Sequence, residues 1–83
     1  MEEKTRITLL GIIVEDVEAT DEINKLLHEN RQYIVGRMGL PYRQRGLAII
    51  SVVLDAPQDV TSALSGKLGM LPGVSVKAVY SKN

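Results

Sequence analysis

The sequence has no cysteine, a single histidine and no long uninterrupted apolar run. Without cysteine, neither a disulfide nor a thiolate metal site can stabilise the fold. No apolar run reaches the roughly 18 residues that would span a bilayer. The N-terminal MEEKTR and the apolar run after it lack the small-residue cleavage site of a signal peptide. These absences predict a cytoplasmic protein that does not contact a membrane.

The short length limits how stable one copy can be. A chain of 83 residues forms a single domain over 1–83, and such a domain buries only about 60–65% of the surface that the unfolded chain exposes. A lone monomer is then marginally stable. Because apolar residues make up 45% of the chain, association with further copies can supply the missing stability.

A catalytic or metal-binding constellation is also missing. His28 lies away from the apolar stripe of its predicted helix, so we expect an exposed side chain near the helix end. A metal role would require carboxylates or a neighbouring subunit, because there is no second histidine. Ser51, Ser62 and Ser65 have no base nearby in the sequence. We therefore expect a non-enzymatic protein with no catalytic residue, no metal and no cofactor.

The charges are segregated although the net charge is zero. Residues 1–30 carry eight acids against three bases, whereas residues 31–54 carry four arginines and no acid. Such segregation favours self-association or a local anion site over general nucleic-acid binding.

Hydrophobic periodicity predicts six elements in the order βαββαβ. Strands are expected over 5–15, from 33, over 46–54 and from 74, and helices over 17–30 and from 57 to 69. The inward-facing residues of the helices are expected to be Ile23, Leu26, Leu27 and Asn30 in the first, and Val60, Ala63, Leu64 and Leu68 in the second. Asp16 or Thr20 can cap the first helix, Pro57 suits the first turn of the second, and Gly69 is expected to be its C-cap glycine.

The predicted fold class is α+β, a ferredoxin-like βαββαβ sandwich with a four-stranded antiparallel sheet and two helices on one face. In this topology the first and third strands are central. The strands over 5–15 and 46–54 are apolar on both sides, which predicts burial of both faces. Because the helices cover only one face, we expect another copy to cover the second. The result would be a dimer or tetramer that packs through the open sheet face or through paired edge strands.

The segment YIVGRMGLPYRQRG, residues 33–46, holds three arginines and three glycines without an acid. Pro41 lacks an amide hydrogen, so its strand must lie at a sheet edge or break there. The candidate ligand- or interface-binding residues are Arg37, Met38, Gly39, Pro41, Tyr42, Arg43 and Arg45. Three interpretations stay open: an exposed hairpin that its arginines keep soluble, pairing with the acidic part of another copy, or a small-ligand site.

Nucleic-acid binding is the alternative function. GRMG at 36–39 matches the GxxG loop with which KH domains clamp a nucleic-acid backbone. That loop needs a helix on each side, whereas strand-like residues flank this one, and the net charge of zero is untypical of such domains. Direct binding through Arg37, Arg43 and Arg45 is therefore the less favoured prediction.

Four stretches of the chain resemble a small family of regulators associated with the iron-only hydrogenase system. They are GIIVED at 11–16, INKLLHE at 23–29, YIVGRMGLPYRQRGLAIISVVLDAP at 33–57 and ALSGKLGMLPGVSVK at 63–77. GRMGLPYR and SGKLGMLPGV are the most distinctive parts. The resemblance implies an ACT-like ferredoxin fold, related to the C-terminal domain of nickel-responsive repressors. It also implies a homo-oligomer that regulates hydrogenase genes or maturation.

The ligands of these related modules do not carry over residue by residue. ACT-type modules commonly bind amino acids at subunit interfaces. They usually carry a glycine in the loop after the first strand, where this chain has residues 15–20 within the sequence VEDVEAT (14–20). Nickel-repressor domains bind metal through several histidines and a cysteine, and this chain has one histidine and no cysteine. The resemblance thus implies a regulator that binds a small ligand or a partner protein. Without a DNA-reading segment before the first strand, any effect on transcription would pass through another protein.

Overall fold

The structure is a computed structural model that describes residues 4–82. Within that range the elements follow the predicted order βαββαβ, with three short 3₁₀ helices between them. The strands are β1 (Arg6–Val14), β2 (Ile34–Tyr42), β3 (Leu47–Ala56) and β4 (Val74–Tyr80). The α-helices are α1 (Thr20–Glu29) and α2 (Gln58–Gly69), and the 3₁₀ helices are η1 (Val17–Ala19), η2 (Arg31–Tyr33) and η3 (Arg43–Arg45).

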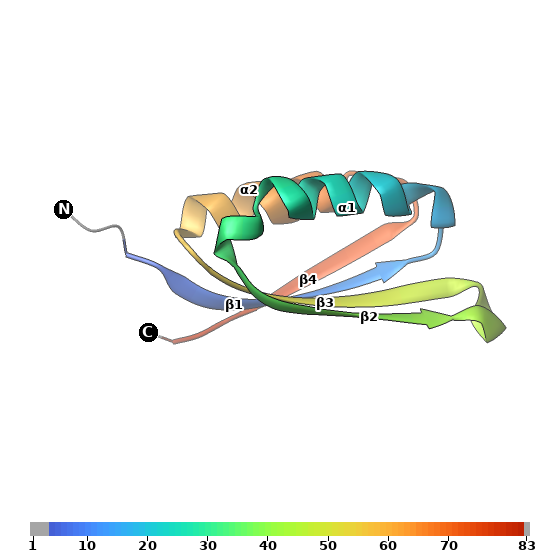
Figure 1. Cartoon of the computed structure of the whole chain (residues 1–83), viewed down its shortest axis with the longest axis horizontal. Coiled ribbons are helices and arrows are strands. Elements are labelled where there is room, and N and C mark those ends of the chain that lie inside the picture. Colours follow the sequence, from blue (N-terminus) through green and yellow to red (C-terminus); the bar gives the residue numbers. More distant parts are fainter. Residues whose placement is uncertain (1–3, 83) are drawn as a thin grey trace.

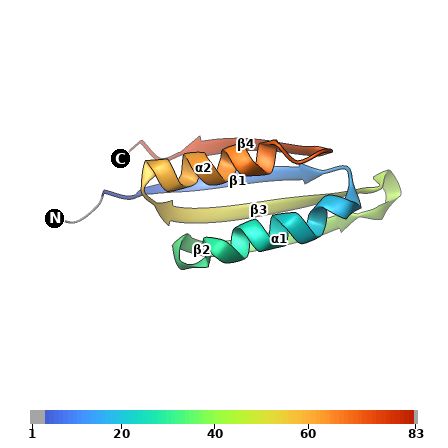
Figure 2. The same cartoon turned by 90° about the horizontal axis from the view of Figure 1, so that it is seen from above.

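The four strands form one antiparallel sheet in the order β2-β3-β1-β4. Both α-helices lie on the same side of this sheet (Figure 1). Seen from above, α1 runs along the β2–β3 half and α2 along the β1–β4 half (Figure 2). The predicted ferredoxin-like α+β fold is confirmed, with β1 and β3 central. Pro41 lies in the edge strand β2, opposite Ala48. An edge strand has a neighbouring strand on one side, so it accommodates a proline without an amide hydrogen better than a central strand would.

The two faces of the central strands are equally apolar but differ in burial. In β1, Leu10 and Ile12 are fully buried beneath the helices, whereas Leu9 and Ile13 are 43% and 44% exposed on the opposite face. The alternation predicted from the sequence is present. The predicted burial of both faces is wrong for one copy, because its helices cover only one side. We call the uncovered side the open face.

Helix α1 presents the predicted stripe to the sheet. Ile23, Leu26 and Leu27 are buried. Asn30 follows the helix and donates from Nδ2 to the Leu26 carbonyl oxygen at 2.9 Å. Of the two cap candidates, Asp16 makes a capping bond: its Oδ1 accepts from the amide of Glu18 at 3.0 Å and thereby begins η1 rather than α1.

The predicted inner side of α2 needs one correction. Leu64 and Leu68 are buried and Val60 is half-buried, but Ala63 is exposed and Thr61 is buried in its place. At about 100° per residue, Ala63 lies about 100° to one side of Leu64, whereas Thr61 and Leu68 lie about 60° and about 40° to the other. The side of α2 that faces the sheet is therefore centred between Thr61 and Leu64.

The predicted role of Gly69 is also wrong. Gly69 is the last residue of α2, and Met70, with a φ of −81°, follows it in the right-handed region. The chain reverses later, where the Val74 amide donates to the Leu71 carbonyl oxygen at 3.2 Å. The glycine that adopts a left-handed conformation in this turn is Gly73, with a φ of 71°. The turn was predicted, but its helix ends in a right-handed turn that needs no glycine.

Candidate functional site

The seven candidate residues occupy the edge hairpin rather than one compact site. Five of them lie on β2, and Arg43 and Arg45 lie on η3 at the turn into β3. Seen from two directions, this hairpin extends beyond the end of the helices (Figures 1 and 2). Arg37 is six residues before Arg43, which corresponds to roughly 20 Å along an extended strand. Arg37 is thus separated from the other two arginines.

The register divides the β2 candidates between the two sides of the sheet. Met38 pairs with Ser51, and Tyr42 pairs with Leu47, on the open face. Arg37, Gly39 and Pro41 lie on the other side, where their β3 partners face the helices: Val52, Ile50 and Ala48. The hairpin therefore contributes apolar side chains to the open face and a guanidinium to the helix side.

The open face carries exposed apolar side chains on all four strands of the sheet. Its exposed members are Ile7, Leu9, Ile13, Met38, Leu40, Tyr42, Ile49 and Val79. Neighbouring strands place Ile13, Ile49 and Leu40 in one row. Gly11 interrupts the surface at the centre of β1, and a shallow apolar hollow forms over it between Ile13, Ile49 and Ser75. No atom outside its own neighbours comes closer than 4.0 Å to where a Cβ at Gly11 would stand.

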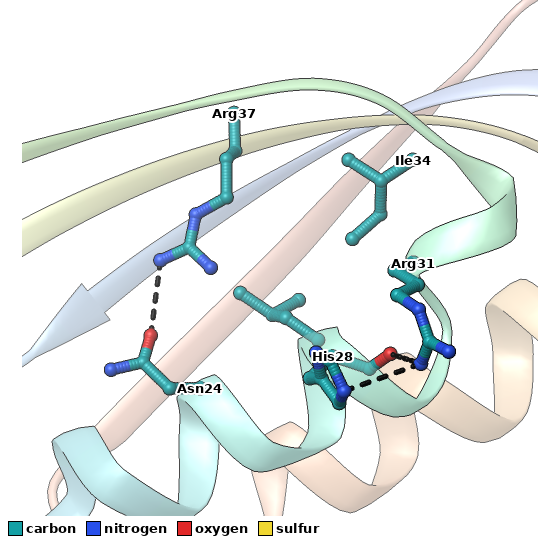
Figure 3. Close-up of a pocket in the computed structure, with 6 residues that line it drawn as sticks. Asn24, His28, Arg31, Ile34 and Arg37 are labelled. Carbon is teal, nitrogen blue, oxygen red and sulfur yellow. Dashed lines mark hydrogen bonds between the residues drawn. The ribbon is translucent and has the colours of Figure 1, made fainter.

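A second hollow, of about 360 Å³, lies on the helix side between α1, η2 and the start of β2. It is lined by Asn24, Leu27, His28, Arg31, Ile34 and Arg37. Figure 3 shows the labelled side chains converging from α1 and from the chain that follows it. Arg37 Nη2 donates to Asn24 Oδ1 at 3.1 Å, and Arg31 Nη1 donates to the His28 carbonyl oxygen at 3.1 Å. We call this site the cationic hollow.

His28 is exposed near the end of α1, as predicted, but it has a partner. Arg31 Nη1 lies 3.3 Å from His28 Nε2. Because a guanidinium can only donate, this contact requires Nε2 to accept and the ring proton to lie on Nδ1. The hydrogen bonds to Asn24 and His28 thus hold the guanidinium groups of Arg37 and Arg31 at two sides of the cationic hollow.

A β-bulge places Arg37 in the cationic hollow. Ile34 pairs with Leu54 and Gly36 pairs with Val53, so Val35 is an extra residue in β2. An extra residue reverses the alternation of sides that follows it. Ile34 and Arg37, three positions apart, consequently lie on the same side of the sheet.

Sequence reasoning missed Asn24, His28 and Arg31 as members of a site. Asn24 and His28 are four residues apart on α1, and Arg31 follows three residues later, which is the spacing of one helix face. This signal was available in the segment INKLLHENR. The sequence could not predict that Arg37 lies beside this face of α1, because its position depends on the bulge.

The charged groups of residues 4–82 form no ion pair with one another. In the same range, no group of three or more histidine, aspartate or glutamate side chains is placed to hold a metal ion. No helix there is long and apolar enough to cross a membrane. The arginines of the hairpin and of the cationic hollow are therefore not neutralised by carboxylates of the described chain.

Comparisons with known proteins identify the family. The TM1266-like family model, described as "Iron-only hydrogenase system regulator, putative", matches residues 6–78. A search of curated proteins gives no match. Among solved structures, the uncharacterized protein TM1266 from Thermotoga maritima is 42% identical, with a TM-score of 0.90, over 94% of this chain and 99% of that one.

Two further solved structures share the fold at low identity. The C-terminal domain of the MgtC protein from Mycobacterium tuberculosis is 13% identical, with a TM-score of 0.73, over 100% of this chain and 95% of that one. The apo form of CPII from Thiomonas intermedia K12, a nitrogen regulatory PII-like protein, is 16% identical, with a TM-score of 0.52, over 92% and 91% of the chains. At these identities the likeness shows the fold alone.

The family match extends across both hollows and the whole edge hairpin. It begins at the first residue of β1 and ends within β4, so it includes every strand that builds the open face. The chain therefore belongs to the TM1266-like family of iron-only hydrogenase system regulators.

Proposed function

We propose that this chain is a non-enzymatic regulator that acts as a homo-oligomer, assembled through the open face, and that it binds a small ligand or a partner protein. The observation that carries the proposal is the exposed apolar surface across all four strands. Large exposed apolar surfaces usually mark sites that another molecule covers.

The size of the open face suits an interface. Four strands about 4.8 Å apart and about nine residues long, at about 3.3 Å per residue, present roughly 500–600 Å² of flat area. The accessible surface of side chains standing on it is larger. A stable protein–protein interface buries about 800 Å² per partner. One face can therefore supply most of what a stable dimer needs.

A second copy is the occupant that the composition favours. Most residues of the open face are apolar. Its polar residues are Ser51 on β3 and Ser75 on β4, and its charged residues are Lys77 on β4 and Asp55 near the end of β3. A two-fold interface brings the same patch of both subunits together, so an apolar patch is complementary to itself. The hollow over Gly11 offers room for a protruding side chain of the partner, such as the exposed Met38.

The edge hairpin is the surface that we assign to regulatory contacts. It projects beyond the helices (Figure 1). Arg43 and Arg45 are exposed at its turn. An oligomer would display several copies of this turn to one partner. Nucleic-acid binding is less favoured, because Arg37 lies on the helix side and roughly 20 Å from the turn, so the three arginines form no single basic surface.

Sedimentation of the full chain and of two matched variants tests the proposal. We expect the unmodified protein to sediment as a dimer or tetramer at micromolar concentration. Ile13→Glu, which puts a charge into the apolar row of Leu40, Ile49 and Ile13 on the open face, should sediment as a monomer. Val17→Glu introduces the same charge at an exposed aliphatic residue of η1, outside the sheet, and should remain oligomeric.

The same experiment can contradict the proposal in two ways. A stable monomer of the unmodified protein at micromolar concentration would mean that no second copy covers the face. An Ile13→Glu variant that assembles as well as Val17→Glu would place the interface elsewhere. Circular dichroism of both variants checks that they are folded.

A further inference from the structure

We propose that the cationic hollow binds the oxyanion group, a phosphate or a carboxylate, of a small molecule that also has a short apolar part. This site lies on the helix side of the sheet, whereas the open face lies on the other (Figure 1). Binding does not require assembly. Its regulatory meaning rests on the ligand-binding role proposed above.

The cationic hollow gathers hydrogen-bond donors without an acid. Its polar lining consists of Asn24, His28, Arg31 and Arg37, and no carboxylate lines it. Each guanidinium uses one terminal nitrogen in the hydrogen bonds to Asn24 and to His28. The remaining N–H groups stay available, and a guanidinium binds phosphate or carboxylate oxygens in pairs. Two such groups on opposite sides of one hollow can hold a single oxyanion between them.

The end of α1 would ordinarily disfavour an anion, because a helix C-terminus carries partial negative charge. Here the last carbonyl groups already accept hydrogen bonds. The Leu26 oxygen accepts from Asn30 Nδ2 at 2.9 Å, the Leu27 oxygen from the Asn30 amide at 3.1 Å, and the His28 oxygen from Arg31. Two full positive charges then exceed the partial charge of the helix end.

The position of Arg37 depends on the β-bulge at Val35, which makes strand β2 irregular. The bulge at Val35 leaves that side chain exposed and interrupts the ladder, but it turns Arg37 toward α1. Without the bulge, Arg37 would lie on the open face beside apolar residues. Bulges commonly redirect a side chain near a functional site.

The dimensions of the cationic hollow limit the ligand. A volume of about 360 Å³ is at the lower end of the range for small-molecule sites. Leu27 and Ile34 supply apolar surface beside the cations, which suits a ligand with a few carbon atoms next to its oxyanion. A polynucleotide fits less well, because α1 also carries Asp21, Glu22 and Glu29, which would repel a chain of phosphates along the helix.

An NMR titration of the full, isotope-labelled chain tests this inference. Inorganic phosphate and valerate serve as the two probes, each at constant ionic strength against sodium chloride. We expect saturable shifts of the Asn24, His28 and Arg37 amide signals with at least one probe. The probe that saturates first identifies the oxyanion as phosphate or carboxylate. Arg31→Gln and Arg37→Gln should each weaken binding at least tenfold, whereas Arg43→Gln and Arg45→Gln, with the same loss of charge, should change it less than twofold.

Three results would overturn the inference. The first is no saturation with either probe up to about 50 mM, which would mean a dissociation constant weaker than about 10⁻² M. The second is equal weakening of binding by all four arginine variants. The third is tighter, salt-sensitive binding of a ten-nucleotide single strand that all four variants weaken equally. The last result would favour a nucleic-acid surface. The amide spectrum of each variant shows whether it is folded.

Sedimentation of the same samples separates this inference from the proposed function. An oligomer that binds neither probe overturns the inference and leaves the assembly through the open face in place. A monomer that binds phosphate or valerate at the cationic hollow supports the inference and contradicts the proposed assembly.

Discussion

Gly73 joins two distant parts of the chain, and a side chain at this position would press against Asp16. Its φ of 71° lies in the left-handed region, and a Cβ built on it would stand 2.8 Å from the Cβ of Asp16 and 3.1 Å from the Asp16 amide nitrogen. Its carbonyl oxygen accepts from the Glu15 amide at 2.7 Å. The turn before β4 is therefore packed directly against the turn after β1.

Gly73→Ala should destabilise the protein by about 1–3 kcal/mol, because the substitution combines a strained φ with backbone contact. Gly69→Ala is the matched control. Gly69 is helical, and nothing lies within 4 Å of where its Cβ would stand, so alanine there should be neutral or stabilise by up to about 1 kcal/mol. Urea unfolding of both variants at one protein concentration measures the difference. Equal stability of the two variants would contradict the close packing at Asp16.

The contrast between Gly69 and Gly73 shows that the sequence predicts the turn before β4 but not which glycine adopts the left-handed conformation. The segment MLPGV predicts a turn, and the structure has one. Which nearby glycine takes the left-handed conformation depends on whether the helix ends in a right-handed turn, and on what the reversing chain meets. Asp16 is more than fifty positions away in the sequence, so no local pattern could indicate that contact.

At the scale of elements, β1 contributes apolar side chains both to the core beneath the helices and to the open face. Leu9 and Leu10 are adjacent, equal in size and oppositely directed. Leu10 packs in the core between sheet and helices. Leu9 stands on the open face, where a second copy would cover it.

Leu10→Ala should lower the free energy of unfolding by about 2–5 kcal/mol at every protein concentration, because it leaves a cavity in the core. Leu9→Ala should have a smaller effect in dilute solution, and an effect that grows with concentration, because oligomers are stabilised by mass action. Urea unfolding at two concentrations a hundredfold apart measures both. A concentration-independent effect of Leu9→Ala would argue against burial of this face in an oligomer.

The elements were predictable because each has a strong period and clear ends. The order βαββαβ, the central place of the strands over 5–15 and 46–54, and the edge position of the strand with Pro41 all followed from the sequence, and the structure confirms them. The candidate site was less predictable. Seven residues of one segment were candidates for ligand or interface binding, and the alternation of β2 and its bulge send Arg37 to one side and Met38 and Tyr42 to the other.

At the scale of the whole molecule, the segregated charged groups form no ion pair with one another within residues 4–82. Acidic and basic side chains of this range can therefore still form ion pairs with other molecules. They could join subunits through arginine–carboxylate pairs, which was one of the interpretations of the hairpin. The open face offers a different connection, through apolar contact.

The salt dependence of assembly distinguishes these two connections. From about 0.1 M to about 1 M salt, the screening length falls from about 10 Å to about 3 Å, so exposed ion pairs between subunits weaken strongly. Apolar burial does not depend on such screening. We therefore expect the dissociation constant of the oligomer, measured by sedimentation equilibrium, to change less than about threefold between about 0.1 M and about 1 M sodium chloride. A rise of tenfold or more, suppressed in Arg43→Gln and Arg45→Gln, would show that the hairpin arginines and not the open face hold the subunits together.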